Sequence, residues 1–138
     1  MIFRALDERT LVAGQIRPED VAEAAAAGVT LIVNNRPDGE EPGQPPGAEI
    51  EAAARAIGLD YVQIPVAGGL SGEQVEEMAG ALAGAKGRTL IFCRSGTRST
   101  SLWALARARS GADGETLIGQ AAAAGYDLSP LRPHLRRE

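Results

Sequence analysis

The sequence predicts an α/β fold, built as a single domain with a mostly parallel central sheet flanked by helices. Short β-rich apolar runs alternate with Ala-rich stretches of helical character through most of the chain. The runs at residues 30–35 and 89–92 are continuous in apolar character, which is typical of strands buried on both faces of a parallel sheet. A length of 138 residues suits one domain, residues 1–138, with a core that needs no disulfide or metal.

The first elements are predicted from two apolar runs and a proline. Residues 2–6 and 10–13 are short apolar runs with a charged segment between them, so we expect two edge strands joined by a turn. Pro18 suits the first turn of a helix, and the Ala-rich residues 19–27 continue that helix until Gly28 ends it.

The rest of the chain continues the alternation of helices and strands. Residues 36–47 are rich in Pro and Gly, which form neither a helix interior nor a central strand, so a long loop is expected there. Ser71 is a suitable N-cap for the helix that follows it. The remaining expected elements are strands over residues 30–35, 61–66 and 89–92, and helices over residues 48–57, 72–84, 99–109 and 112–125.

The loops that follow the predicted strands are the expected place for a binding site. In an open parallel sheet the carboxyl ends of the strands share one edge, and ligands bind in the crevice outside that edge. The loops beginning at Arg36, Ala67 and Cys93 should therefore converge.

Composition excludes several classes of function. A net charge of −4 without long runs of one sign gives no reason to expect a nucleic-acid or anionic-membrane partner. No apolar run approaches the roughly 18 to 20 residues of a membrane span, so we expect a cytoplasmic protein. One cysteine and one histidine exclude an internal disulfide and make a metal site improbable, so we expect neither a metal nor another cofactor. Residues 130–138 form a basic tail that we expect to be loosely ordered.

The strongest candidate for chemistry is Cys93, which opens the loop of residues 93–98 between a buried strand and a helix. Helix-terminal N–H groups and the positive end of the helix dipole favour a thiolate nucleophile there. Gly96 allows the tight turn that points N–H groups inward as an anion cradle, and Arg98 can grip two oxygens of the anion. An inert core cysteine is the alternative, but two arginines and three hydroxyl residues close behind it favour an anion site.

The other residues of this loop are candidates for secondary roles. Ser99 is the preferred hydrogen-bond partner of the thiolate, which makes it a candidate catalytic residue. Ser95, Gly96 and Thr97 are candidates for binding the substrate, although at least one hydroxyl is expected to cap the helix instead. Arg94 either recruits anionic substrates at the rim or is simply exposed to solvent.

The loop after residue 35 supplies further candidates. Arg36 is a candidate for substrate binding and Asp38 for catalysis, since both follow a buried strand and can reach the crevice. The alternative is that these two residues pair with each other and do nothing more.

The sequence Thr-Leu-Ile-Phe-Cys-Arg-Ser-Gly-Thr-Arg-Ser-Thr at residues 89–100 resembles the bacterial beta-lactamase hydrolase-like family, phosphatase-like domain. Residues 13–15, 33–40 and 61–66 also match, so the resemblance covers the chain from about residue 10 to 108. It implies a cysteine-phosphatase-like fold similar to dual-specificity and tyrosine phosphatases. Members of the family are described as rhodanese-like sulfur transferases, which implies a persulfide, thiosulfate or phosphate ester as the small anionic substrate.

The resemblance leaves two reactions open, and the residues help to choose between them. Cysteine phosphatases carry His-Cys-x5-Arg, whereas this chain has Phe92 before the cysteine and a loop one residue shorter, as in rhodaneses. Phosphatases also carry an aspartate general acid on the loop that corresponds to residues 67–71, where no acid stands. Such an acid is worth roughly 10² to 10⁴ in rate, because an alkoxide leaving group must be protonated.

The favoured function is therefore sulfane-sulfur transfer through a Cys93 persulfide, which a thiol acceptor then collects. Hydrolysis of phosphomonoesters or phosphotyrosine through a Cys93 phosphoenzyme is the alternative, since Asp38, Glu40 or Glu41 could supply an acid from the neighbouring loop. A further alternative is a non-catalytic sensor of anions or phosphoproteins.

Overall fold

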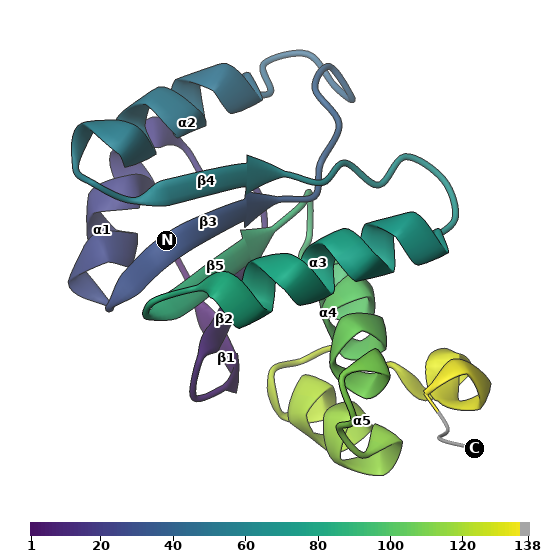
Figure 1. The fold of residues 1–138 in the computed structure, drawn as a ribbon. Coiled ribbons are helices and arrows are strands. Elements are labelled where there is room, and N and C mark those ends of the chain that lie inside the picture. Colours follow the sequence, from purple (N-terminus) through teal and green to yellow (C-terminus); the bar gives the residue numbers. More distant parts are fainter. Residues whose placement is uncertain (136–138) are drawn as a thin grey trace.

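The computed structural model of the protein, which describes residues 1–135, contains one five-stranded sheet with helices on both faces (Figure 1). The strand order is β1-β2-β5-β3-β4, in which β1 pairs antiparallel with β2 and every other pair is parallel. The strands are β1 Arg4–Asp7, β2 Thr10–Ala13, β3 Val29–Asn34, β4 Asp60–Gln63 and β5 Arg88–Phe92. The predicted α/β class with a mostly parallel sheet is confirmed.

The helices divide into two groups that cover opposite faces of the sheet (Figure 1). Each group buries apolar side chains against the strands and so forms one half of the core. One half of the core includes residues of α1 Val21–Ala26 and α2 Gly47–Ala56, with a short 3₁₀ helix η1 Pro18–Asp20 before α1. The other half includes residues of α3 Gly72–Gly84, α4 Thr97–Arg109 and α5 Gly114–Ala123.

The amino-terminal hairpin differs from the prediction in one respect. Both of its strands were expected at an edge of the sheet, but only β1 lies there, because β2 pairs with β5 on its other side. All four residues of β2 are buried, as its apolar run Leu11-Val12-Ala13 requires. The carboxyl end of β2 therefore lies beside the carboxyl end of β5, where Cys93 follows.

The carboxyl-terminal segment also differs from the prediction of a loose tail. A 3₁₀ helix, η2 Ser129–His134, follows α5, and Leu135 after it is buried among the residues of the α3–α5 half of the core. A basic composition predicted exposure, but Leu128 and Leu135 on either side of η2 are buried in this core and Leu131 packs against it, so apolar burial holds the segment in place. Residues 136–138, the rest of the predicted tail, lie outside the described residues.

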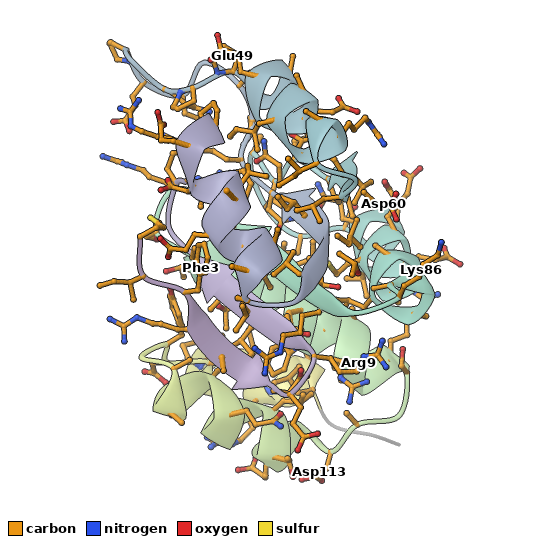
Figure 2. The ribbon with its side chains drawn as sticks, turned by 90° about the vertical axis from the view of Figure 1, so that its left-hand side faces the viewer. Phe3, Arg9, Glu49, Asp60, Lys86 and Asp113 are labelled. Atoms are coloured by element: carbon orange, nitrogen blue, oxygen red, sulfur yellow. The ribbon has the colours of Figure 1, made fainter. Side chains whose placement is uncertain are left out.

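The two ends of the parallel strands carry different segments of the chain. Figure 2 shows Arg9, Asp60 and Lys86 together on one side of the molecule, where β2, β4 and β5 begin. The loops that could form a site leave the strands at the opposite edge. Over residues 1–135, no helix combines the length and apolar character that a membrane crossing requires.

Candidate active site

The loop after β5 presents Cys93 at the start of α4. Leu90, Ile91 and Phe92 are fully buried, so the strand fixes the position of the cysteine that follows it. Cys93 is itself buried, and its Sγ accepts a hydrogen bond from the N–H of Gly96 at 3.1 Å. Gly96 is the N-cap of α4 with φ of +94°, a left-handed conformation that glycine adopts without strain. The backbone therefore turns so that the N–H of Gly96 points at the sulfur, whereas the anion cradle itself stays a prediction.

Arg98 lies beside this sulfur and is held by two neighbouring loops. Its two Nη atoms donate to the carboxylate of Glu40 at 2.7 and 2.8 Å, and Nη1 also donates to the carbonyl of Val66 at 2.7 Å. The hydrogen bonds to Glu40 raise the pKa of Arg98 most, and the negative charge of the Cys93 thiolate raises it further. Arg98 thus connects the loop after β3 and the residues after β4 to the sulfur.

Five alternating charges form an ion-pair network that joins the loop after β3 to the loop after β5. Arg36 is at its centre, only 1% exposed, and donates to Glu40 at 2.8 Å and to Glu41 at 2.9 Å. Glu40 continues to Arg98, and Glu41 lies 3.5 Å from Arg94. A buried guanidinium is tolerated only when it is paired, and here two carboxylates pair with it.

The ion-pair network keeps its carboxylates ionised. Hydrogen bonds from Arg98 and then Arg36 lower the pKa of Glu40 to about 2. A hydrogen bond from Arg36 is also the main reason that the pKa of Glu41 is lowered. Burial alone would lower the pKa of Arg36, but its bonds to both glutamates outweigh burial and raise it. At neutral pH neither carboxyl group therefore carries a proton that it could donate to a leaving group.

The turn after β2 approaches the Cys93 loop closely. The N–H of Gln15 donates to the carbonyl of Arg94 at 3.1 Å, and Gln15 Oε1 accepts from Arg36 Nη1 at 3.1 Å. A Cβ added at Gly14 would lie 3.0 Å from the carbonyl oxygen of Arg94, a tight contact that would require the backbone of the loop to shift by a few tenths of an ångström. Sequence reasoning gave Gly14 and Gln15 no role, although a glycine directly after a buried strand was a usable signal.

A tyrosine from the carboxyl-terminal region completes the surroundings of the loop. The hydroxyl of Tyr126 donates to the carbonyl of Ser95 at 2.9 Å, and its ring lies against Gly96. Burial raises the pKa of Tyr126, and the negative charge of Cys93 raises it further. Sequence reasoning missed this residue, because nothing in the segment after α5 indicates that it returns to a loop 30 positions earlier in the chain.

Two predicted site residues, Asp38 and Ser99, have surroundings other than those expected. Asp38 does not pair with Arg36; its Oδ1 accepts from the N–H of Gly47 at 2.8 Å, at the start of α2. The Oγ of Ser99 is buried and has no hydrogen-bond partner among the described residues. Ser99 was expected to donate a hydrogen bond to the sulfur of Cys93, but the N–H of Gly96 donates there instead. A thiolate contact for Ser99 stays a prediction.

The hydroxyl residues of the loop do not cap the helix. Ser95 Oγ and Thr97 Oγ1 lie 3.1 Å apart, and no side chain accepts a hydrogen bond at the N-cap of α4. The expected side-chain cap is therefore wrong, because Gly96 takes the N-cap position and the helix begins at Thr97 rather than at residue 99.

The predicted convergence of loops is observed. Bonds of Arg98 join residues of the segments that begin at Arg36, near Ala67 and at Cys93 into one site. Within residues 1–135 no cluster of three or more His, Cys, Asp or Glu side chains could hold a metal ion. The arrangement brings together the sulfur of Cys93, the N–H of Gly96 and the guanidinium of Arg98, groups whose chemistry suits an anionic ligand.

Residues 2–110 match the family described as "Beta-lactamase hydrolase-like protein, phosphatase-like domain". The chain belongs to this family. It is 35% identical over 137 residues to a beta-lactamase hydrolase-like protein of Xylella fastidiosa, strain Temecula1, covering 96% of this chain and 31% of that relative. The family member described here thus spans about a third of the length of the curated relative.

Solved structures agree with the family. A candidate phosphatase from Neisseria meningitidis Z2491 superposes with a TM-score of 0.84 at 32% identity, covering 98% of this chain and 96% of that one. Tk-PTP in its active form superposes with a TM-score of 0.69 at 19% identity, covering 96% and 92% of the two chains, a likeness that shows the fold alone. The predicted cysteine-phosphatase-like fold and the predicted family are confirmed.

Proposed function

We propose that this protein transfers sulfane sulfur through a persulfide on Cys93. The thiolate of Cys93 attacks the outer sulfur of thiosulfate or of a glutathione persulfide, which forms a new S–S bond. The old S–S bond breaks and its electron pair leaves with sulfite or the glutathione thiolate. A thiolate acceptor then attacks the outer sulfur of the Cys93 persulfide, takes that sulfur and restores the Cys93 thiolate.

The observation that carries this proposal is the state of the acids around the loop. Glu40, with a pKa of about 2, is bound to two guanidinium groups and is ionised at neutral pH. Asp38 accepts a backbone hydrogen bond at the start of α2, and residues 67–71 contain no carboxylate. Sulfite and thiolates leave without being protonated, whereas an alkoxide does not, so the site suits sulfur transfer better than ester hydrolysis.

Arg98 can donate hydrogen bonds to an anionic substrate while it stays bonded to Glu40. A guanidinium has five N–H groups, and its bonds to Glu40 and Val66 use three of them. The other two are available to the sulfur and to the oxygens of a bound anion. The ion-pair network has three arginines and two glutamates, which leaves one positive charge for the anion.

Phosphomonoester hydrolysis is the second candidate, because the matched family is described as a phosphatase-like domain and the structural neighbours include phosphatases. The Neisseria structure is that of a candidate phosphatase, and another structure of the same fold, PTPMT1, was solved with PI(5)P. In this reaction Cys93 would attack phosphorus, the alkoxide would leave, and water would hydrolyse the phosphoenzyme.

Mass spectrometry of the intact protein separates the candidates. After exposure to thiosulfate or glutathione persulfide, the wild-type protein should gain one sulfur atom, which added thiol removes, and Cys93→Ser should gain none. An unchanged mass together with Cys93-dependent hydrolysis of an aryl phosphate would establish the phosphatase. Neither product, with anion binding retained in Cys93→Ser, would instead support the sensor.

A further inference from the structure

Two carbonyl groups of the Cys93 loop are bound from outside the loop. The carbonyl of Arg94 accepts from the N–H of Gln15 at 3.1 Å, and the carbonyl of Ser95 accepts from the hydroxyl of Tyr126 at 2.9 Å. In a trans peptide the C=O and the N–H point in opposite directions. The Gly96 N–H accordingly faces away from Tyr126, and it donates to Cys93 Sγ at 3.1 Å.

The peptide between Ser95 and Gly96 is the part of the loop that can most easily turn over. Its rotation changes ψ of Ser95 and φ of Gly96, and glycine accepts either sign of φ at similar cost. A turned peptide would point the Ser95 carbonyl oxygen toward the thiolate and its anion, replacing attraction by repulsion. The glycine that allows the cradle to form therefore also allows it to be lost.

Tyr126 opposes this rotation in two ways. Its hydroxyl bond holds the Ser95 carbonyl outward, and its half-buried ring packs on the loop backbone. A Cβ at Gly96 would lie 2.9 Å from the ring carbon Cζ, so the ring occupies the space directly over this residue. With its raised pKa, the hydroxyl remains a protonated donor at neutral pH.

We infer that Tyr126 is a positioning residue of the active site, whose hydroxyl fixes the Ser95–Gly96 peptide with its N–H toward the Cys93 sulfur. Tyr126 does not touch the reacting atoms and acts through the backbone of the loop. The inference rests on the proposed function insofar as the cradle holds the anion that Cys93 attacks. It assigns a role to the segment after α5, which lies beyond the matched residues 2–110.

The test is Tyr126→Phe, which removes the donor and keeps the ring. Tyr61→Phe is the matched control, because the Tyr61 hydroxyl bonds to Asn34 and Gln63 and not to the loop. Three experiments are made on each protein. ¹⁵N NMR gives the Gly96 amide resonance, a titration at constant ionic strength gives the affinity for inorganic sulfate, and steady-state kinetics gives kcat and KM for thiosulfate.

In Tyr126→Phe we expect the Gly96 resonance to shift or broaden and the sulfate affinity and kcat to fall about two- to tenfold, the effect of losing one neutral hydrogen bond. Tyr61→Phe should lose stability without these changes. An unchanged Gly96 resonance and unchanged sulfate affinity in Tyr126→Phe would overturn the inference, whatever its thermal stability. If the wild-type protein transfers no sulfur, the proposed function fails, but the resonance and the sulfate affinity still decide the role of Tyr126.

Discussion

Glu40 shows how one residue can link the stability of this fold to its chemistry. Its carboxylate bonds to the buried Arg36 and to Arg98 beside the sulfur, which lowers its pKa from the ordinary value of 4.5 to about 2. Because the folded-state pKa is the lower one, the ionised carboxylate stabilises the fold above pH 4.5. That stabilisation is lost as the pH falls toward 2.

We predict that Glu40→Gln flattens the dependence of stability on pH between 4.5 and 2. Allowing for solvent at this half-exposed residue, the variant should lose about 1 to 2 kcal/mol at pH 7. Urea unfolding of both proteins at several pH values measures this. Glu51→Gln is the control, because it breaks only an exposed ion pair with Arg55. It should lower the free energy of unfolding by no more than about 0.5 kcal/mol. Parallel pH profiles for wild type and Glu40→Gln would contradict the prediction.

Ser99 gives a second test at the residue scale. Its Oγ is buried without a partner among the described residues, so Ser99→Ala removes an unsatisfied polar group and should not lower the melting temperature. If the hydroxyl turns to the thiolate during catalysis, kcat for sulfur transfer should fall about tenfold. Thermal unfolding and steady-state kinetics on the same preparation separate the two effects. A kcat equal to that of the wild type would remove Ser99 from the catalytic residues.

At the scale of elements, the turn after β2 lies so close to the Cys93 loop that the size of the side chain at position 14 should matter. We predict that Gly14→Ala pushes Arg94 away and weakens its bond to Gln15, because the new Cβ would stand 3.0 Å from the Arg94 carbonyl. Activity should fall about tenfold as the loop shifts. Steady-state kinetics measures the effect.

The control for Gly14→Ala is Gly69→Ala. A Cβ at Gly69 meets nothing within 4 Å, so this variant should keep its activity and gain slightly in stability. Equal activities of the two variants would show that the β2 turn does not position the loop.

The order of the elements was predictable from sequence because each strand that enters the core is a short apolar run punctuated by Gly or Pro. The place of β2 was not, since its pairing with β5 depends on a contact between residues almost 80 positions apart. The same limit applies to the site. Cys93 and Arg98 share one local pattern with Gly96, but Tyr126 reaches the loop only through the packing of α4 and α5.

At the scale of the whole molecule, the carboxyl-terminal segment contributes to the core despite its polar composition. Leu135 is 1% exposed, and its backbone lies against Gly114 at the start of α5. We predict that Leu135→Ala lowers the free energy of unfolding by about 2 to 4 kcal/mol. Leu131→Ala is the control, because Leu131 is only partly buried and should cost less. Similar losses measured by denaturant unfolding would mean that Leu135 does not anchor the segment.

The ion-pair network has a consequence for how this family can diverge. Since each carboxylate in it pairs with two guanidinium groups, a neutral residue at Arg36 would remove the one excess positive charge of the network and leave Glu40 and Glu41 with one guanidinium partner each. We expect homologues to exchange these positions jointly, so that a sequence without an arginine at 36 also lacks one or both of the acids. The two loops would then be inherited as a unit, with covariation between residues more than 50 positions apart.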